Sequence, residues 1–255
     1  MPYQVVDGRR WFYAVHPGDP ERPPVVLIHG AGGNHLVWPA QVRRLPHYTV
    51  YAPDLPGHGR SEGPALPSIP AYRDALLAWA DALGLETFVP VGHSMGGAIA
   101  QELALAVPRR LAALVLVATG ARLRVHPSIL RGLRENFEDT VRFLSQWAYG
   151  DEPPPPLLDV FVEQVMATSP EVVYGDFAAC DVWDRMGDVK DISVPTLVLG
   201  GESDRLTPPK FLRYLAEHIP QAELVLIPGA GHMVMVEAPD AVARAISTWL
   251  ERVVG

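Results

Sequence analysis

The sequence contains a single cysteine, Cys180, so no disulfide can form within the chain. Its surroundings, FAACDVWD, hold no second cysteine at metal-ligand spacing, and we expect an ordinary packed side chain there. Lysine is also scarce, with only Lys190 and Lys210, and the net charge is −8. A chain this acidic, without a long basic run, is not expected to bind nucleic acid or an anionic membrane surface.

Long apolar runs are missing as well. No window reaches the roughly 20 apolar residues of a transmembrane helix, and the N-terminal stretch MPYQVVDGRRWFY has no apolar segment after its charges. We therefore expect a cytoplasmic protein with no membrane partner. With 255 residues, 48% of them apolar, the chain is long enough for one large domain with a substantial core. The sequence does not indicate an oligomeric state.

Short apolar runs alternate with helix-like segments along most of the chain, which indicates an α/β fold with a mostly parallel sheet flanked by helices. A hairpin is predicted across Asp7-Gly8, a strong two-residue turn signal. Further strands are predicted within 24–30, 48–59, 87–94, 111–119, 195–201 and 222–229. Helices are predicted over 35–45, 69–83, 95–107 and 237–253, the last with an apolar face that includes Val242, Ile246 and Trp249.

One region interrupts the alternation. Residues 121–190 contain several helical segments, no convincing strand and the run DEPPPP. We interpret 121–190 as a helical cap inserted into a single domain that spans 1–255, with Pro153–Pro156 as a stiff cap loop. Open α/β sheets bind ligands at the carboxyl ends of their strands, so this cap would cover a pocket. The alternative is a helical excursion with no role in binding.

The segment Gly92-His93-Ser94-Met95-Gly96 lies between an apolar strand and an Ala-rich helix. This is the setting of a G-x-S-x-G nucleophile elbow, a sharp turn that lifts the serine hydroxyl clear of the sheet. The pattern is weak without its context. A serine hydroxyl also needs a positioned base, which is itself oriented by an acid.

Candidates for that base and acid follow two later strands. Asp204 comes a short loop after 195–201, and His232 a short loop after 222–229. Both are expected at the sheet edge that carries Ser94, in the chain order serine, acid, histidine. The sequence therefore predicts Ser94, Asp204 and His232 as a catalytic triad. Glu202 is the rival acid, disfavoured because the turn after Asp204 ends the loop there.

A developing oxyanion needs hydrogen-bond donors. The N–H of Met95, at the start of a helix, is one candidate. The N–H of Ala31 is the other, since Gly30, Gly32 and Gly33 would let that loop approach closely; the alternative is a plain tight turn.

The remaining histidines and acids have no ligand spacing. His29 and His58 lie in loops near the strand ends and are possible pocket neighbours, whereas His93 is expected to pack beside the elbow. No cluster of cysteine, histidine and carboxylate residues has metal-ligand spacing, so we expect no metal and no cofactor.

The chain resembles the α/β-hydrolase superfamily in five segments. The segments that carry the resemblance are HGAGG at 29–33, PDLPGHGRS at 53–61, GHSMGG at 92–97, GESDRLTP at 201–208 and PGAGHMVMVEAP at 228–239. The chain is most similar to the small serine carboxylesterases, lactone hydrolases and carbon–carbon hydrolases, and 176–204 resembles enol-lactonases. The resemblance implies an eight-stranded sheet, a cap and the triad. Relatives with aspartate at the elbow are excluded by Ser94.

These features predict a serine hydrolase acting on small-molecule esters of short to medium acyl chain through an acyl-enzyme. A lactone or carbon–carbon hydrolase on the same triad is the alternative, and a non-catalytic ligand receptor is a more distant one. Ala31 stands where many relatives have a bulky aromatic residue, so a roomier acyl pocket is expected. The candidates to line the cap side, or to form the cap core, are Leu130, Phe137, Phe143, Leu144, Trp147, Phe161, Val165, Met166 and Trp183.

Overall fold

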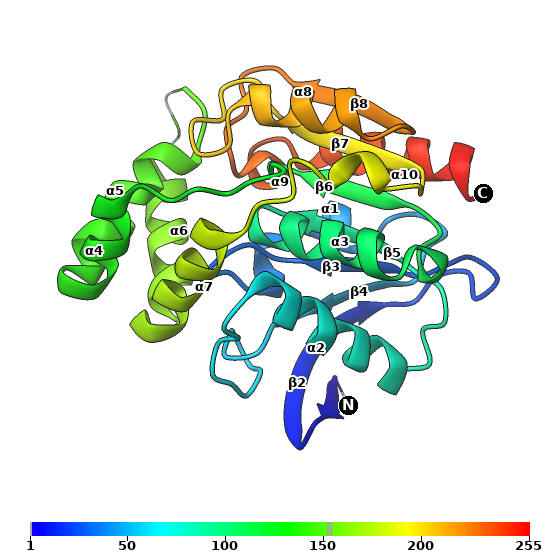
Figure 1. Ribbon diagram of the computed structural model, residues 1–255, viewed down its shortest axis with the longest axis horizontal. Helices are drawn as coiled ribbons and strands as arrows, with labels where there is room; N and C mark the ends of the chain where they lie inside the picture. Colours follow the sequence, from blue (N-terminus) through cyan, green and yellow to red (C-terminus); the bar gives the residue numbers. More distant parts are fainter. Residues whose placement is uncertain (1, 152, 154) are drawn as a thin grey trace.

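The computed structural model describes residues 2–151, 153 and 155–255. Eight strands form one sheet in the order β1-β2-β4-β3-β5-β6-β7-β8 (Figure 1). They are β1 (Tyr3–Val6), β2 (Arg9–His16), β3 (Val25–Ile28), β4 (Val50–Pro53), β5 (Val89–His93), β6 (Leu114–Val117), β7 (Thr196–Gly201) and β8 (Ala222–Ile227). Pairing is parallel throughout except that β2 is antiparallel to both β1 and β4. The predicted mostly parallel, eight-stranded sheet is confirmed.

The hairpin at the start of the chain explains the one reversed strand. Asp7 and Gly8 have φ values of 48° and 76°. Positive φ at both central residues is what a two-residue type I′ turn requires, and this turn suits the twist of the strands it joins. The chain therefore turns back at Asp7-Gly8, as predicted, and β2 runs against its neighbours.

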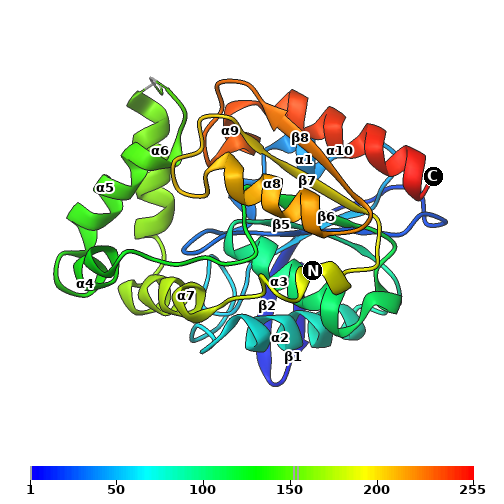
Figure 2. The same cartoon turned by 45° about the horizontal axis from the view of Figure 1, so that its top comes forward.

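Helices lie on both faces of the sheet and, as a separate group, at one end of it (Figure 2). They are α1 (Ala40–Arg43), α2 (Ile69–Ala82), α3 (Met95–Ala106), α4 (Pro127–Glu135), α5 (Phe137–Ala148), α6 (Pro155–Met166), α7 (Pro170–Val182), α8 (Pro209–His218), α9 (Val234–Glu237) and α10 (Pro239–Val253). Side chains alternate along a strand, so β3 sends Val26 and Ile28 into the core under α2, α3 and α8, and Val25 and Leu27 into the core under α1 and α10. No helix in the described ranges is long and apolar enough to cross a membrane.

Proline accounts for two differences from the predicted helices. The segment expected as one helix over 35–45 is a 3₁₀ turn (His35–Val37) followed by α1, with Pro39 between them. The C-terminal helix predicted over 237–253 is divided into α9 and α10, and Pro239 opens α10. Proline lacks the N–H that a continuing helix needs but fits the first turn of a new one.

The strand predicted within 48–59 is also shorter, because β4 ends at Pro53. The next residue, Asp54, is fully buried, and its carboxylate accepts hydrogen bonds from the N–H groups of His35 and Arg60, at 2.7 and 2.9 Å. These side-chain contacts replace strand pairing and fold the rest of the segment into a loop.

The four helices α4–α7 lie between β6 and β7 in the chain and gather at one end of the sheet (Figure 2). They enclose a small apolar cluster of their own, made of Leu133, Val141, Val162, Val165 and Val173. An isolated antiparallel bridge between Arg122 and Asp184 brings the two ends of this insertion together, and their side chains are 3.6 Å apart. Of the run Pro153–Pro156, predicted as a stiff loop, residue 154 lies outside the described residues, and Pro155 and Pro156 instead form the start of α6.

Candidate active site

Ser94 occupies a sharp turn between β5 and α3. Its backbone angles, φ 54° and ψ −115°, lie outside the regions that non-glycine residues normally adopt, and such strain costs on the order of 1–3 kcal/mol. Two glycines make the turn possible: a Cβ on Gly92 would collide with the carbonyl oxygen of Gly96, and a Cβ on Gly96 with that of Ile28. The strained turn leaves Ser94 half-buried at the wall of a pocket.

The end of β6 holds this turn in place. The N–H of Ser94 donates to the carbonyl oxygen of Val117 at 3.0 Å, and the hydroxyl of Thr119 donates to the carbonyl oxygen of Ser94 at 2.8 Å. Thr119 is fully buried. Nothing in the local sequence separates Thr119 from any other residue after a strand, so this contact is not foreseen from the sequence.

Asp204 lies in the loop after β7 and is almost fully buried. Its carboxylate accepts hydrogen bonds from the N–H groups of Leu206 and Thr207, both at 2.8 Å, and from the Thr207 hydroxyl at 2.7 Å. Burial alone would raise the pKa of Asp204, but the charge and hydrogen bond of His232 and the donors from Thr207 outweigh it and lower that pKa. The rival acid Glu202 is exposed to solvent.

His232 lies in the loop after β8 and faces Asp204. Its Nδ1 is 3.0 Å from Oδ2 of Asp204 and 3.1 Å from the hydroxyl of Thr207. With the Nδ1 proton directed at the carboxylate, Nε2 is left as the basic nitrogen. Thr207 is a contact that the prediction omits. Aspartate and threonine are both residue types whose short polar side chains form local hydrogen bonds in loops, so the pair Asp204 and Thr207 carries a weak signal.

The loop that carries His232 is held from two sides. His93 Nε2 donates to the carbonyl oxygen of His232 at 3.0 Å, and burial, reinforced by the neighbouring His232, lowers the pKa of His93 to about 3. Glu237 accepts hydrogen bonds from the N–H groups of Gly231 and Gly150, at 2.9 and 2.8 Å. Neutral His93 thus packs beside the elbow as expected, while Glu237 joins the histidine loop to the chain after α5.

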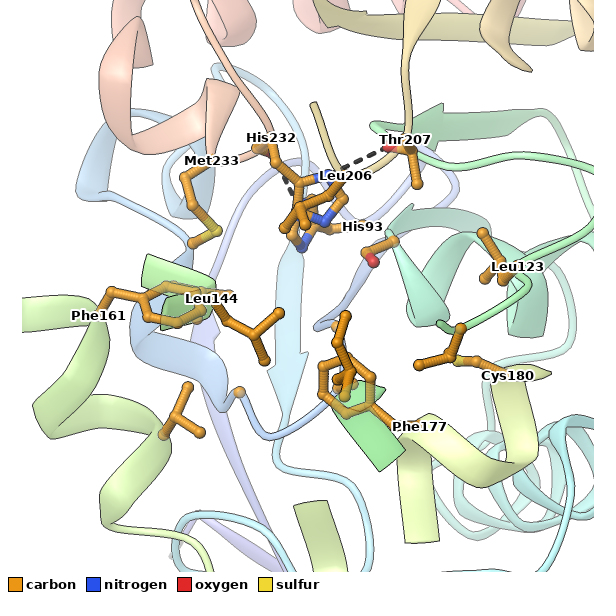
Figure 3. A pocket seen from close by; sticks show the side chains of 18 of the residues that line it. His93, Leu123, Leu144, Phe161, Phe177, Cys180, Leu206, Thr207, His232 and Met233 are labelled. Carbon is orange, nitrogen blue, oxygen red and sulfur yellow. Dashed lines mark hydrogen bonds between the residues drawn. The ribbon is translucent and has the colours of Figure 1, made fainter. Parts of the chain in front are cut away.

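Ser94 and His232 line the same pocket, and Figure 3 shows His232 with its neighbours His93, Leu206 and Thr207 along one side of it. No hydrogen bond joins Ser94 Oγ to His232 in the described part of the chain. Catalytic hydrogen bonds are often long in ligand-free sites and tighten when substrate binds. The arrangement brings a strained serine, a histidine and a buried carboxylate to one edge of the sheet.

The loop after β3 lies against the elbow. A Cβ on Gly30 would stand 3.1 Å from His93 Nδ1 and 3.2 Å from Ser94 Cβ, so the glycine permits the close approach. The N–H of Ala31 in this loop has no hydrogen-bond partner among the described residues, nor has the N–H of Met95 at the first turn of α3. Two unpaired donors beside a nucleophile could receive a developing negative charge.

Two other predicted neighbours of the pocket lie beneath it. His29 is fully buried, its Nδ1 donating to the carbonyl oxygen of Gly30 and its Nε2 accepting from the N–H of Leu55. Burial, with the neighbouring His58, lowers the pKa of His29 to about 4, so it is neutral. His58 is buried as well and pairs with Asp176 of α7. Neither ring lines the pocket.

The pocket between the sheet edge and α4–α7 has a cavity volume of about 170 Å³. Its walls are mainly apolar. The polar lining residues are those beside the elbow and the histidine loop, and, on the side of the cap, Arg124, His126 and Gln164. Cys180 also lines it, and burial raises the pKa of that thiol, so Cys180 behaves as a packed side chain. In the described residues no three histidine, cysteine or carboxylate side chains lie close enough to hold a metal ion.

The residues predicted to line or pack the cap separate into groups. Leu144, Phe161 and Val165 face the pocket. Phe143, Trp147 and Met166 do not fit either prediction, since they are 49%, 41% and 39% exposed. Phe143 and Trp147 lie one helical turn apart on the outer side of α5, with ring centroids 5.9 Å apart.

The others lie in or below the cap core. Phe137 packs on the cap cluster, and Leu130 is half-buried outside the pocket lining. Trp183 is buried below the cap, and its indole N–H donates to Glu102 at 2.9 Å. Helical spacing alone does not reveal which side of a short cap helix faces inward.

Comparison with known proteins agrees with this geometry. Residues 25–245 match the model of the alpha/beta hydrolase family. A pimeloyl-[acyl-carrier protein] methyl ester esterase from Pectobacterium carotovorum subsp. carotovorum (strain PC1) is 34% identical over 239 residues, covering 87% of this chain and 92% of that protein.

Solved structures are similar over the full length. A thermophilic esterase is 36% identical with a TM-score of 0.85, covering 98% of this chain and 97% of that one. The enol-lactonase from Burkholderia xenovorans LB400 is 27% identical with a TM-score of 0.89, covering 98% of this chain and all (100%) of that one. The resemblance inferred from the sequence motifs is confirmed: this chain belongs to the α/β-hydrolase family.

Proposed function

We propose that this protein is a serine hydrolase that cleaves carboxylic esters of short to medium acyl chain, with Ser94 as nucleophile, His232 as base and Asp204 as the orienting acid. The observation that carries the proposal is the strained Ser94 turn, which stands beside two unpaired N–H groups and the Asp204–His232 pair. The similarity to esterases supports the same reaction class.

In the first half-reaction, Ser94 Oγ bonds to the ester carbonyl carbon while His232 Nε2 takes its proton. The carbonyl oxygen becomes an oxyanion, which the N–H groups of Ala31 and Met95 stabilise. Asp204, ionised because its pKa is lowered, holds the imidazole in the right tautomer and stabilises the imidazolium.

The tetrahedral intermediate then collapses. The bond to the alcohol oxygen breaks, and His232 gives its proton to the departing alcohol, leaving an acyl group on Ser94. A water molecule next gives its proton to His232 and bonds to the acyl carbon. The bond to Ser94 Oγ then breaks, His232 gives its proton to that oxygen, and the acid is released with the serine hydroxyl restored.

The pocket supports a limited acyl length. Its walls are apolar and the cavity is about 170 Å³, a volume that suits short to medium chains. The relative named above as a methyl ester esterase supports a small alcohol as leaving group.

A lactone is the second candidate substrate, because the enol-lactonase covers 98% of this chain at a TM-score of 0.89. Lactone opening uses the same serine chemistry, with the leaving alcohol still attached to the acyl group. Turnover of a δ-enol-lactone, compared with p-nitrophenyl butyrate, ranks the two substrate classes.

The test is labelling with a fluorophosphonate, followed by peptide mass spectrometry. We expect one adduct, on Ser94, with loss of p-nitrophenyl butyrate turnover in proportion to labelling. Turnover without labelling of Ser94 would refute the assigned nucleophile. A protein that takes no label and turns over neither esters nor lactones would instead be a ligand receptor.

A further inference from the structure

A buried ion pair joins the cap to the body of the protein away from the proposed triad. Nε2 of His58, in the loop after β4, lies 2.7 Å from Oδ2 of Asp176 in α7, and both side chains are fully buried. Nδ1 of His58 is 3.0 Å from the carbonyl oxygen of Pro56. Both partners only accept hydrogen bonds, so His58 carries both ring protons and is charged.

Asp176 also reaches the loop proposed to bind the oxyanion. Its Oδ2 accepts the N–H of Gly32 at 2.9 Å, and its Oδ1 accepts the hydroxyl of Tyr72 at 2.6 Å. The carbonyl oxygen of Gly32 accepts the hydroxyl of Thr168, between α6 and α7, at 3.3 Å. Both polar groups of the Gly32 backbone are therefore bonded to cap side chains.

Packing reinforces these contacts. Gly32 has φ +65°, and a Cβ there would stand 3.2 Å from Val173 and 3.3 Å from Val165, both of the cap cluster. The loop itself supplies one internal hydrogen bond, from the N–H of Gly33 to the carbonyl oxygen of Gly30, at 3.1 Å. The orientation of the peptide after Ala31 thus depends on α6, α7 and the turn between them.

We propose that Asp176 is a positioning residue: through Gly32 it fixes the orientation of the Ala31 N–H, so that docking of the cap completes the oxyanion hole. This proposal rests on the proposed function. A buried ion pair contributes little net stability over an apolar pair of the same size, because removing both charges from water is costly. Its value here is the geometry it imposes on Gly32.

A second buried carboxylate provides the matched control. Glu102 of α3 accepts hydrogen bonds from Trp183 Nε1 at 2.9 Å and Arg185 Nε at 2.7 Å. Glu102 therefore ties the chain leaving the cap to the body of the protein, as Asp176 does, but its hydrogen bonds and ion pairs do not involve residues 30–33. We therefore expect Glu102→Gln to weaken the attachment of the cap and to leave the hydrogen bonds of Gly32 in place.

The experiment compares Asp176→Asn, Thr168→Val and Glu102→Gln on p-nitrophenyl butyrate. A misplaced donor is expected to cost less than the roughly 10²-fold to 10³-fold of a deleted one. Asp176→Asn should therefore lower kcat about 10-fold to 100-fold with KM changed by less than about threefold. Thr168→Val should lower kcat by a smaller factor, whereas Glu102→Gln should keep kcat within about threefold of the wild type.

A transition-state analogue separates positioning from general damage. A trifluoromethyl ketone adds to Ser94 and forms an oxyanion, whereas the alcohol of the same chain length only fills the pocket. Asp176→Asn should weaken binding of the ketone by the same factor by which kcat/KM falls, and should leave binding of the alcohol unchanged.

An unchanged kcat in Asp176→Asn, or an equal loss of kcat in Glu102→Gln, would overturn the proposal while wild-type esterase activity stands. If the wild type itself has no such activity, the proposed function fails first. If Asp176→Asn does not fold, Thr168→Val decides: a lower kcat at constant KM supports positioning, and an unchanged kcat refutes it.

Discussion

The loops at the strand ends and the cap meet at the same pocket, but they hold their functional groups differently. In the loop after β7, the carboxylate of Asp204 is bonded to Leu206 and Thr207, two and three residues further along the chain. In the cap, Asp176 is bonded to residues 104 to 144 positions away. Asp204 is thus positioned largely by its own loop, while Asp176 acts through contacts between the cap and distant segments. Changes in the loops should remove activity, and changes in the cap should adjust it.

Among changes in the strand-end loops, Ser94→Ala should cause the largest loss of activity. We expect kcat/KM to fall by at least about 10⁴-fold, because the acyl-enzyme cannot form. The melting temperature should stay within about 2 °C of the wild type, since the hydroxyl is not needed for packing. Ser203→Ala, in the loop beside Asp204, is the control and should keep activity within about threefold. Wild-type rates in Ser94→Ala would end the assignment.

Asp204→Asn should follow, with a loss of up to about 10⁴-fold in kcat, because an amide at this position favours the wrong imidazole tautomer. Glu202→Gln, two residues earlier and exposed, should change kcat by less than about threefold. The two variants are compared by steady-state rates on one ester. A larger loss of kcat in Glu202→Gln than in Asp204→Asn would show that Glu202, and not Asp204, orients the base.

Changes in acyl chain length should alter kcat/KM by an intermediate amount, because the pocket has a limited volume. Each methylene that enters the pocket contributes about 0.8 kcal/mol, or about fourfold in kcat/KM, until the space is full. Rates on p-nitrophenyl esters should rise from acetyl to a maximum at about four to eight carbons and then fall. Ala31→Phe should move the maximum to shorter chains. Rates that climb as far as palmitoyl esters would contradict a capped pocket.

The ion pair of the cap should give the smallest effect, on stability as a function of pH. Burial would lower the pKa of His58, but the charge and hydrogen bond of Asp176 outweigh it and raise that pKa. A raised pKa adds stability that is fully present below the unfolded value, about 6.5, and lost as pH rises through the folded value. The other titratable groups facing this pair are Asp54, His29, Tyr72 and Cys180.

The contribution of this ion pair is measured against the double variant His58→Gln/Asp176→Asn, which removes both charges. Its melting temperature, followed by calorimetry from pH 6 to pH 9, should approach that of the wild type as pH rises. The difference should shrink by about 2–4 °C for each 1 kcal/mol of lost pairing. A difference that grows with pH would mean that His58 is neutral in the folded protein.

The same contrast explains what the sequence can predict. Ser94, Asp204 and His232 each come shortly after a strand, namely β5, β7 and β8. Parallel strands bring their carboxyl ends to one edge of the sheet, so short sequence patterns are enough to predict that the three residues lie close together. Asp176 offers no such signal, because its partners come from distant segments. The sequence also does not predict that Phe143 and Trp147 lie on the outward side of α5, because the way the cap docks decides which side of that helix faces solvent.

The antiparallel bridge between Arg122 and Asp184 has a consequence for the evolution of substrate range. Because the cap begins and ends at one residue pair, we expect that the insertion can be exchanged as a unit with both ends of the graft side by side. The proposed tie between Asp176 and Gly32 limits that freedom. A transplanted cap would need its own acceptor for the Gly32 N–H, so a chimera grafted at 122 and 184 without one should bind new esters yet hydrolyse them slowly.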